Sequence, residues 1–194
     1  MALNVDEILD LYEKRGARMY GSEPVSQTEH ALQCAMLAAE GGAAAELIAA
    51  SFLHDVGHLI AELPHSLERE SDDVHQFLPI PFLRGTFADA VLEPIRLHVD
   101  AKRYLCRVDA SYWDALSPAS KHSLELQGGM FDAIAADRFL SRPFSWDAIR
   151  LRRWDDFSKI AGRVTPSLRD IEPILRSLEH RNTGNTERTL LLNS

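Results

Sequence analysis

The sequence predicts an all-α fold, a bundle of helices. No run of residues alternates between apolar and polar with the period of two that marks a half-buried strand. Apolar residues instead recur at helical spacing, and most of these runs begin behind a residue that can cap a helix and stop near glycine. At 194 residues the chain fits one domain, expected over 1–181, followed by a tail, 182–194, to which no role is assigned.

Helix signals can be followed along the chain in order. Asn4 can cap the first helix, and Ser26 and Glu29 form a capping box before the second, which carries His30. Residues 62–85, rich in charge and proline, are expected to be irregular. The expected helices run from Asn4 to about Lys14, from Ser26 to Gly41, from Ala43 into the stretch Phe52–His58, from Thr86 to Arg103, from Ser117-Pro118 to Gly128, from Ser145 to Gly162, and from Thr165-Pro166 to about His180.

Composition narrows the class of function. The net charge of −8 argues against a nucleic-acid partner, because phosphate backbones are held by clustered Lys and Arg. A small anionic substrate remains compatible with a locally basic pocket. Two cysteines, Cys34 and Cys106, do not make a disulfide framework, so a cytoplasmic location is expected. No signal peptide and no apolar stretch of ~20 residues is found, so no membrane partner is expected.

One short stretch carries the chemistry. His54-Asp55 closes an apolar run that includes Phe52 and Leu53, and His58 follows one helical turn later. Two imidazoles and a carboxylate should not end an apolar run unless something compensates their burial, since unpaired buried charge is costly. A bound metal would supply that compensation. The sequence therefore predicts a metal site centred on this stretch.

The remaining histidines, and the carboxylates near the end of the expected domain, are candidates for further metal ligands. Two adjacent metals need a carboxylate that can bridge them, and Asp55 is placed to do so. Sites rich in histidine and carboxylate suit iron or manganese, whereas thiolates would indicate structural zinc. Asp156 competes with Asp155 for one role, and His65, His122 and His180 are expected to be solvated. The candidate ligands are His30, His54, Asp55, His75, His98 and Asp155.

This order of residues resembles the HD-domain superfamily, in which most proteins are phosphohydrolases. Flanking motifs resemble a smaller branch, the mixed-valent di-iron oxygenases of the PhnZ type, which cleave organophosphonates and are related to myo-inositol oxygenase. The resemblance spans about residues 17–162 and departs from the family pattern at Gln76 and Asp100. The motifs are Tyr20–Glu23, Gln27–Cys34, His98–Leu105, Ala110–Tyr112, Leu116–Ser120, Leu126–Gly129 and Arg152–Asp155.

The resemblance implies a role for each candidate residue. It implies two iron ions, a mixed-valent Fe(II)/Fe(III) pair, bridged by Asp55, and it favours Asp155 over Asp156 as a ligand. Glu23 would draw Tyr20 away from the metal when substrate enters. The implied ligands are His30, His54, Asp55 and Asp155 for one iron, and Asp55, His75, His98 and Tyr20 for the other; the implied phosphonate contacts are His58, Lys102, Ser120 and Arg152.

The reaction implied is oxidative cleavage of a carbon–phosphorus bond by O₂, giving a carboxylate and phosphate. Expected substrates are 2-amino-1-hydroxyethylphosphonate, giving glycine, and 1-hydroxy-2-(trimethylamino)ethylphosphonate, giving glycine betaine. Asp100 favours the trimethylated compound, because a carboxylate near the site would suit a quaternary ammonium. Two alternatives stay open: a metal-dependent phosphohydrolase acting on a small phosphate ester, and an HD module that binds a ligand without catalysis.

Overall fold

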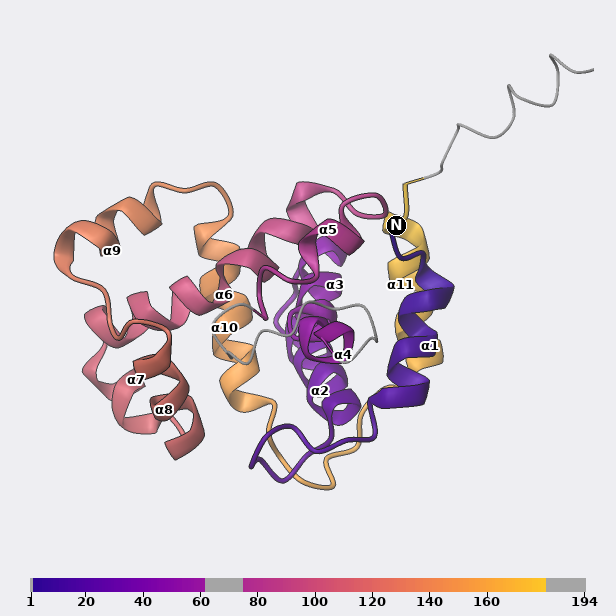
Figure 1. Cartoon of the computed structure of the whole chain (residues 1–194), viewed down its shortest axis with the longest axis horizontal. Coiled ribbons are helices and arrows are strands. Elements are labelled where there is room, and N and C mark those ends of the chain that lie inside the picture. The colour runs from indigo at the N-terminus through magenta and orange to yellow at the C-terminus, as the bar shows by residue number, and fades with distance from the viewer. Residues whose placement is uncertain (1, 62–74, 181–194) are drawn as a thin grey trace, which may run out of the picture.

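A computed structural model of the chain describes residues 2–61 and 75–180. These residues form eleven α-helices and no strand, so the all-α prediction is confirmed (Figure 1). His65 and the expected tail 182–194 lie outside the described residues, and the domain boundary stays a prediction. The helices are α1 (Val5–Arg15), α2 (Gln27–Glu40), α3 (Ala45–Leu53), α4 (Val56–Ala61), α5 (Ile80–Leu83), α6 (Asp89–Val108), α7 (Ala110–Ala115), α8 (Pro118–Leu126), α9 (Ala133–Leu140), α10 (Ser145–Phe157) and α11 (Leu168–Leu178).

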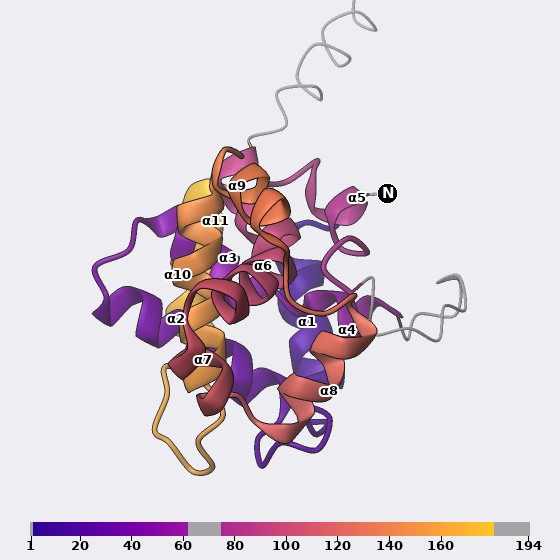
Figure 2. The same ribbon diagram turned by 90° about the vertical axis from the view of Figure 1, so that its left-hand side faces the viewer.

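Four helices, α2, α3, α6 and α10, pack against one another and form the centre of the bundle. On one flank α1 and α11 lie side by side and cover α3 and α4, while α7, α8 and α9 gather on the other flank (Figures 1 and 2). The main apolar core lies among the central helices and the α1/α11 pair. A smaller core joins α6 to the flank that contains α7 to α9. No helix among the described residues is long and apolar enough to cross a membrane.

The expected capping signals operate at the first two helices and at α8. Asn4 accepts a hydrogen bond from the Glu7 amide at 2.9 Å. Ser26 and Glu29 form the expected capping box, with the Glu29 carboxylate accepting the Ser26 amide at 2.7 Å. Ser117 likewise caps α8. These bonds satisfy amides that a helix start leaves without partners, which is why the sequence signals are reliable here.

The prediction of one continuous helix through His54-Asp55 is wrong. Helix α3 ends at Leu53 and α4 begins at Val56, with the His-Asp pair in the break. In this break the His54 Nδ1 lies 2.9 Å from the Ser51 carbonyl, the acceptor that a continuing helix would offer to the Asp55 amide. The break lets the two adjacent side chains approach the same cluster.

Three other expected boundaries differ from the structure. Helix α6 begins after Ala88 rather than at Thr86, whose hydroxyl donates to the Leu3 carbonyl, and it continues beyond Arg103. Helix α10 stops well before Gly162, at a point where the Ser158 hydroxyl donates to the Asp155 carbonyl at 2.7 Å. Helix α11 starts behind a capping box formed by Ser167 and Asp170, not behind Thr165. In each case a competing hydrogen bond displaces the expected boundary.

Three short helices, α5, α7 and α9, had no sequence prediction. Helix α5 lies inside the stretch that was expected to be irregular. The residues just before it pack near α4, where Gly57 allows a close approach. A Cβ at Gly57 would lie 2.1 Å from the His75 carbonyl oxygen and 3.1 Å from Pro79 Cδ. The absence of a side chain at residue 57 therefore sets the position of His75.

We expect Gly57→Ala to destabilise the protein by about 1–3 kcal/mol, because the added methyl group overlaps backbone rather than a flexible side chain. It should also lower metal content by displacing His75. Denaturant unfolding and metal analysis measure the two effects. Gly42→Asn is the control, since residue 42 has φ +65°, open space around it and a conformation that Asn tolerates. Equal stability of Gly57→Ala and the wild type would contradict the prediction.

Candidate metal centre and substrate cavity

The central helices bring together most of the predicted metal ligands. His30 comes from α2, His98 from α6 and Asp155 from α10, while His54 and Asp55 occupy the break between α3 and α4. All five are buried, with Asp55 the most exposed at 5%. His75, which follows α4 at a distance along the chain, is partly exposed, as is Tyr20. Residues far apart in sequence thus meet at one point in the core.

A first group of ligand atoms surrounds one oxygen of Asp55. The Nε2 atoms of His30 and His54 lie 3.2 Å apart, and Asp55 Oδ2 lies 3.6 and 3.3 Å from them respectively. Asp155 Oδ1 lies 3.4 Å from His30 Nε2. Ligand atoms about 3 Å apart are what six-coordinate geometry with metal–ligand bonds of about 2.1 Å requires. These four side chains can therefore hold one metal ion.

A second group surrounds the other oxygen of the same carboxylate. Asp55 Oδ1 lies 3.4 Å from His75 Nε2 and 3.6 Å from His98 Nε2, and these two nitrogens are 3.1 Å apart. One carboxylate thus presents each of its oxygens to a different set of histidines. This is the arrangement of a bridging carboxylate between two metal ions.

His58 was predicted to contact the phosphonate, but it also lies close to the second group of metal ligands. Its ligand atom falls within 4.8 Å of those of Asp55 and His75, so these three also form a group that could hold a metal. The rings of His58 and His75 stack with centroids 4.6 Å apart. His58 also lines the adjacent cavity. Its assignment to the phosphonate rather than the metal stays a prediction.

Backbone carbonyls orient three of the histidine rings. The Nδ1 atoms of His30, His54 and His98 donate to the carbonyls of Ser158, Ser51 and Ile95, at 2.9, 2.9 and 2.7 Å. A carbonyl can only accept, so Nδ1 carries the proton in each ring and a neutral ring keeps a lone pair on Nε2. All three Nε2 atoms face the two groups. The tautomers are those that a metal site needs.

The buried carboxylates fit a cationic occupant. Within the described part of the chain, no oxygen of Asp55 or Asp155 accepts a hydrogen bond of normal geometry. Arg152 Nη1 stands 2.6 Å from Asp155 Oδ2 as an ion-pair partner, whereas the Asp55 oxygens face the imidazoles of four histidines. Carboxylates buried without partners are costly, so metal ions at the two groups would satisfy them.

The electrostatics of the metal-free cluster follow from the same contacts. Burial opposes protonation of His54, but the Asp55 carboxylate outweighs it and raises the His54 pKa to about 9. For Asp155, burial acts to raise the pKa, but the Arg152 guanidinium together with Lys159, His54 and His30 holds the pKa below its usual range. At neutral pH the metal-free cluster therefore contains a protonated imidazole beside ionised carboxylates.

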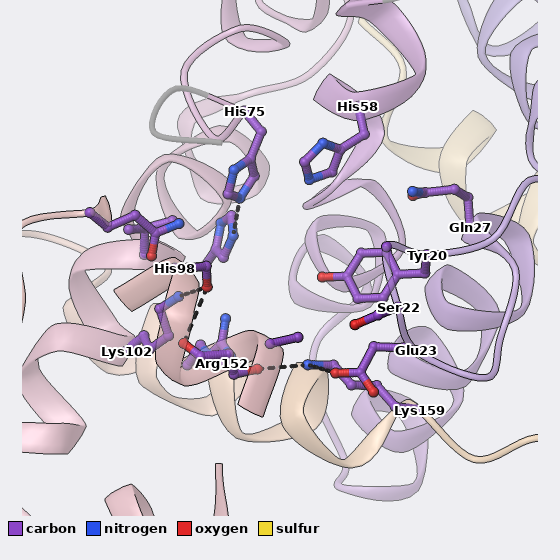
Figure 3. Close-up of a pocket in the computed structure, with 16 residues that line it drawn as sticks. Tyr20, Ser22, Glu23, Gln27, His58, His75, His98, Lys102, Arg152 and Lys159 are labelled. Carbon is purple, nitrogen blue, oxygen red and sulfur yellow. Dashed lines mark hydrogen bonds and ion pairs between the residues drawn. The ribbon is translucent and has the colours of Figure 1, made fainter. Parts of the chain in front are cut away.

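Next to the ligand groups lies a cavity of about 220 Å³ (Figure 3). The predicted contacts Lys102, Ser120 and Arg152 all line it, as do Tyr20 and Glu23. Lys102 is 2% exposed and donates to the Ser123 hydroxyl at 2.8 Å. A protein with a net charge of −8 thus concentrates cations inside one pocket. Such a pocket suits a small anion.

Tyr20 and Glu23 are held together by a tight turn before α2. The Glu23 amide donates to the Tyr20 carbonyl at 3.0 Å. The Tyr20 ring stacks on His30 of the first group, with centroids 4.0 Å apart. Burial first, and then the Asp55 carboxylate, raise the pKa of the Tyr20 phenol well above its ordinary value. The pair stands between the ligand groups and the cavity, and its gating role stays a prediction.

Asp155 and Asp156, which compete for one predicted role, occupy different positions. Asp155 faces the histidines, whereas Asp156 pairs with Arg152 Nη2 and accepts the Tyr112 hydroxyl at 2.5 Å. Arg152 Nε also lies 3.1 Å from that hydroxyl. Asp156 and Tyr112 therefore orient Arg152, a contribution that the sequence did not suggest.

Other cavity residues were also missed by the sequence reasoning. Lys159 lies four residues after Asp155, a spacing that would have indicated the same helix face, but α10 ends before it. Ser117 was predicted only as a cap, and it also donates to Glu23 at 2.7 Å. Gln27 stands in a family-like motif but was given no role, and Ser123 stands in no motif. Polar residues of this kind are recognised only once the cavity is known.

Asp100 does not face the cavity, contrary to the expectation based on it. Its carboxylate lies 2.9 Å from Arg142 Nη1 and 3.9 Å from Arg103 Nη1. The position two residues after His98 turns it to another side of α6. The expectation that Asp100 would favour a trimethylated substrate is therefore wrong.

The fold and the site define a class: an all-α protein whose buried histidine–carboxylate groups can hold metal ions beside a cavity for an anion. No protein-family model matches the chain. It is 42% identical over 181 residues to a hydroxymethylphosphonate dioxygenase of Gimesia maris, covering 91% of this chain and 89% of that protein. It is 34% identical to a [1-hydroxy-2-(trimethylamino)ethyl]phosphonate dioxygenase (glycine-betaine-forming) of Leisingera caerulea, covering 93% and 92%.

An uncharacterised protein of Acanthamoeba polyphaga mimivirus is also 34% identical, over 82% of this chain and 74% of that protein. The chain belongs to the family of hydroxyphosphonate dioxygenases. The resemblance inferred from the flanking motifs is thereby confirmed, and so is the prediction of an oxygenase.

Asp55→Ala should abolish binding of both metal ions, because the two groups share this carboxylate. His98→Ala should remove chiefly the second ion, and His58→Ala should leave the metal content unchanged. Metal analysis after anaerobic reconstitution with iron measures all three variants. Loss of one ion in His58→Ala would make His58 a ligand instead of a phosphonate contact.

Metal loading should release protons at neutral pH. His54, with a pKa of about 9, carries a proton in the metal-free protein at pH 7, and metal must displace it from Nε2. About one proton should therefore appear per chain, and metal affinity should rise with pH until His54 is deprotonated near pH 9. A pH indicator in weak buffer reports the release. Metal affinity that does not vary between pH 6 and 9 would contradict this.

Proposed function

We propose that the chain is a cytoplasmic di-iron dioxygenase that uses O₂ to cleave the carbon–phosphorus bond of a 1-hydroxyphosphonate, giving a carboxylate and inorganic phosphate. One observation carries this proposal: the two oxygens of Asp55 face separate histidine pairs next to a cation-lined cavity. The HD-domain assignment, based on the His54-Asp55 pair, is part of the same proposal.

The donor set supports iron as the metal. Only imidazole nitrogens and carboxylate oxygens meet at the two groups, a combination that suits iron or manganese and lacks the thiolates of structural zinc sites. When bound, a mixed-valent Fe(II)/Fe(III) pair would supply the redox chemistry that attacks a bond resistant to hydrolysis. Tyr20 beside His30 favours an oxygenase over a phosphohydrolase, because metal-activated water needs no gate of this kind.

The chain's own residues would bind and orient the substrate. Lys102, Ser120 and Arg152 would hold the phosphonate, and the ion pair of Arg152 with Asp155 would set its distance from the first ligand group. Burial of Lys102 and Arg152 strengthens their hydrogen bonds to a dianion by limiting competition from water. Glu23, three residues after Tyr20, would draw the Tyr20 phenol aside to open a position for O₂.

The residues that line the cavity also indicate which substituent the substrate can carry at C1. One relative is named for hydroxymethylphosphonate and another for the trimethylamino compound. Tyr20 is the one phenyl-type ring among the described lining residues, whereas hydroxyl and amide groups are common there. Quaternary ammonium groups are held by aromatic faces, so this lining favours a substituent that is absent or can donate hydrogen bonds.

Oxygen uptake and phosphate release test the function. Iron-loaded protein should consume O₂ and release phosphate with hydroxymethylphosphonate, 2-amino-1-hydroxyethylphosphonate or 1-hydroxy-2-(trimethylamino)ethylphosphonate. Lys102→Ala should keep its iron but raise KM about tenfold or more, the usual worth of a hydrogen bond to a charged group. Phosphate release from a phosphate ester without O₂ uptake would instead establish the phosphohydrolase.

A further inference from the structure

Lys159 lies just beyond the end of α10 and lines the cavity. Its side chain is 11% exposed, and its Nζ donates to the Ser120 hydroxyl at 3.1 Å. Glu23 Oε1 lies 3.8 Å from the same Nζ, and the two side chains face each other in Figure 3. Lys159 therefore touches a predicted phosphonate contact and adjoins the predicted gate.

The charge of Lys159 is held differently from that of Arg152. The Arg152 guanidinium pairs with Asp155 at 2.6 Å and with Asp156 at close range. The two carboxylates near Lys159 lie at 3.8 and 4.0 Å, beyond the range of a charge-assisted hydrogen bond. Its ammonium donates a hydrogen bond to a neutral hydroxyl, that of Ser120, and lies 5.7 Å from the centroid of the Tyr20 ring. Lys159 can thus exchange a carboxylate neighbour for a better-placed anion at small cost.

Glu23 has a second partner that keeps it near Lys159. The Ser117 hydroxyl donates to Glu23 Oε1 at 2.7 Å and also caps α8 by accepting the Ser120 amide at 3.1 Å. Glu23, Ser117, Ser120 and Lys159 therefore form a closed ring between the turn before α2, the start of α8 and the end of α10. A phosphonate oxygen placed on Ser120 would lie within reach of Lys159 and would repel the Glu23 carboxylate.

We infer that Lys159 is a further phosphonate-binding residue, and that it exchanges Glu23 for the phosphonate when substrate enters. The inference rests on the proposed function, because it takes the ligand of the cavity to be a phosphonate. The exchange supplies a physical cause for the movement of Glu23. Arrival of the dianion removes the attraction of Lys159 for Glu23, and the Glu23 carboxylate can then exchange its hydrogen bond from Ser117 for one from Tyr20.

Binding without turnover tests the inference. Methylphosphonate, which lacks the C1 hydroxyl, is titrated calorimetrically into iron-loaded protein under nitrogen. Lys159→Met should weaken binding about tenfold or more, as expected for the loss of a hydrogen bond to a charged group. Lys121→Met is the matched control, because Lys121 is on α8, outside the cavity lining, with its Nζ over the Trp113 ring. Wild-type affinity in Lys159→Met would overturn the inference.

A double-mutant cycle tests the exchange itself. Glu23→Gln should strengthen methylphosphonate binding several-fold by removing the competing carboxylate, and this gain should vanish in the Lys159→Met background. A gain of the same size in both backgrounds would overturn the exchange. Iron content and melting temperature, unchanged in each variant, would confirm that the effect is not a loss of structure.

The experiments distinguish a failure of the Lys159 inference from a failure of the proposed function. If the wild type consumes no O₂ with any 1-hydroxyphosphonate but the methylphosphonate cycle behaves as expected, the proposed function fails and the role of Lys159 stands. If O₂ consumption and phosphate release occur while Lys159→Met binds methylphosphonate like the wild type, the function stands and the role of Lys159 fails.

Discussion

Burial of the Asp55 carboxylate is the constraint on which the rest of the structure depends. A carboxylate that is 5% exposed must be compensated, and here four imidazoles converge on it, two on each oxygen. Each imidazole comes from a different segment of the chain, so the helices must pack in one arrangement for the cluster to form. The break between α3 and α4 and the bare backbone at Gly57 serve the same end, because they bring Asp55 and His75 to within contact. Fold and site are therefore specified together.

Backbone carbonyls fix the ligand rings, and at His30 the Ser158 hydroxyl also lies 3.1 Å from Nδ1. His54 and His98 donate Nδ1–H to carbonyls three residues earlier, and His30 donates to the carbonyl of Ser158 at the end of α10. Such bonds set both the tautomer and the direction of Nε2. Since the carbonyls of Ser51 and Ile95 belong to α3 and α6, the orientations of the His54 and His98 rings are as rigid as those helices.

Much of the fold and of the ligand set could be predicted from local patterns. The capping boxes at Asn4 and Ser26 place α1 and α2, and an apolar run that ends in His54-Asp55 indicates a metal whatever the tertiary structure. The start of α6 could not be predicted, because Thr86 bonds to Leu3, which is distant in sequence. The role of Lys159 could not be predicted either, because it depends on Ser120, and only the packing of α8 against the end of α10 reveals that contact. Asp156 was considered only as a rival ligand to Asp155, although it lies one helical turn after Arg152 and pairs with it.

Helix α10 joins the two halves of the site. Arg152 and Asp155, three residues apart on this helix, are bonded to each other while one lines the cavity and the other faces the histidines. A helix is stiff over one turn, so the separation between an anion on Arg152 and a metal at Asp155 is set by the backbone. A substrate must then carry its phosphonate and its metal-binding oxygen on neighbouring atoms to reach both. A 1-hydroxyphosphonate has that spacing, whereas a compound with its hydroxyl one carbon further away would lose either the clamp or the metal contact.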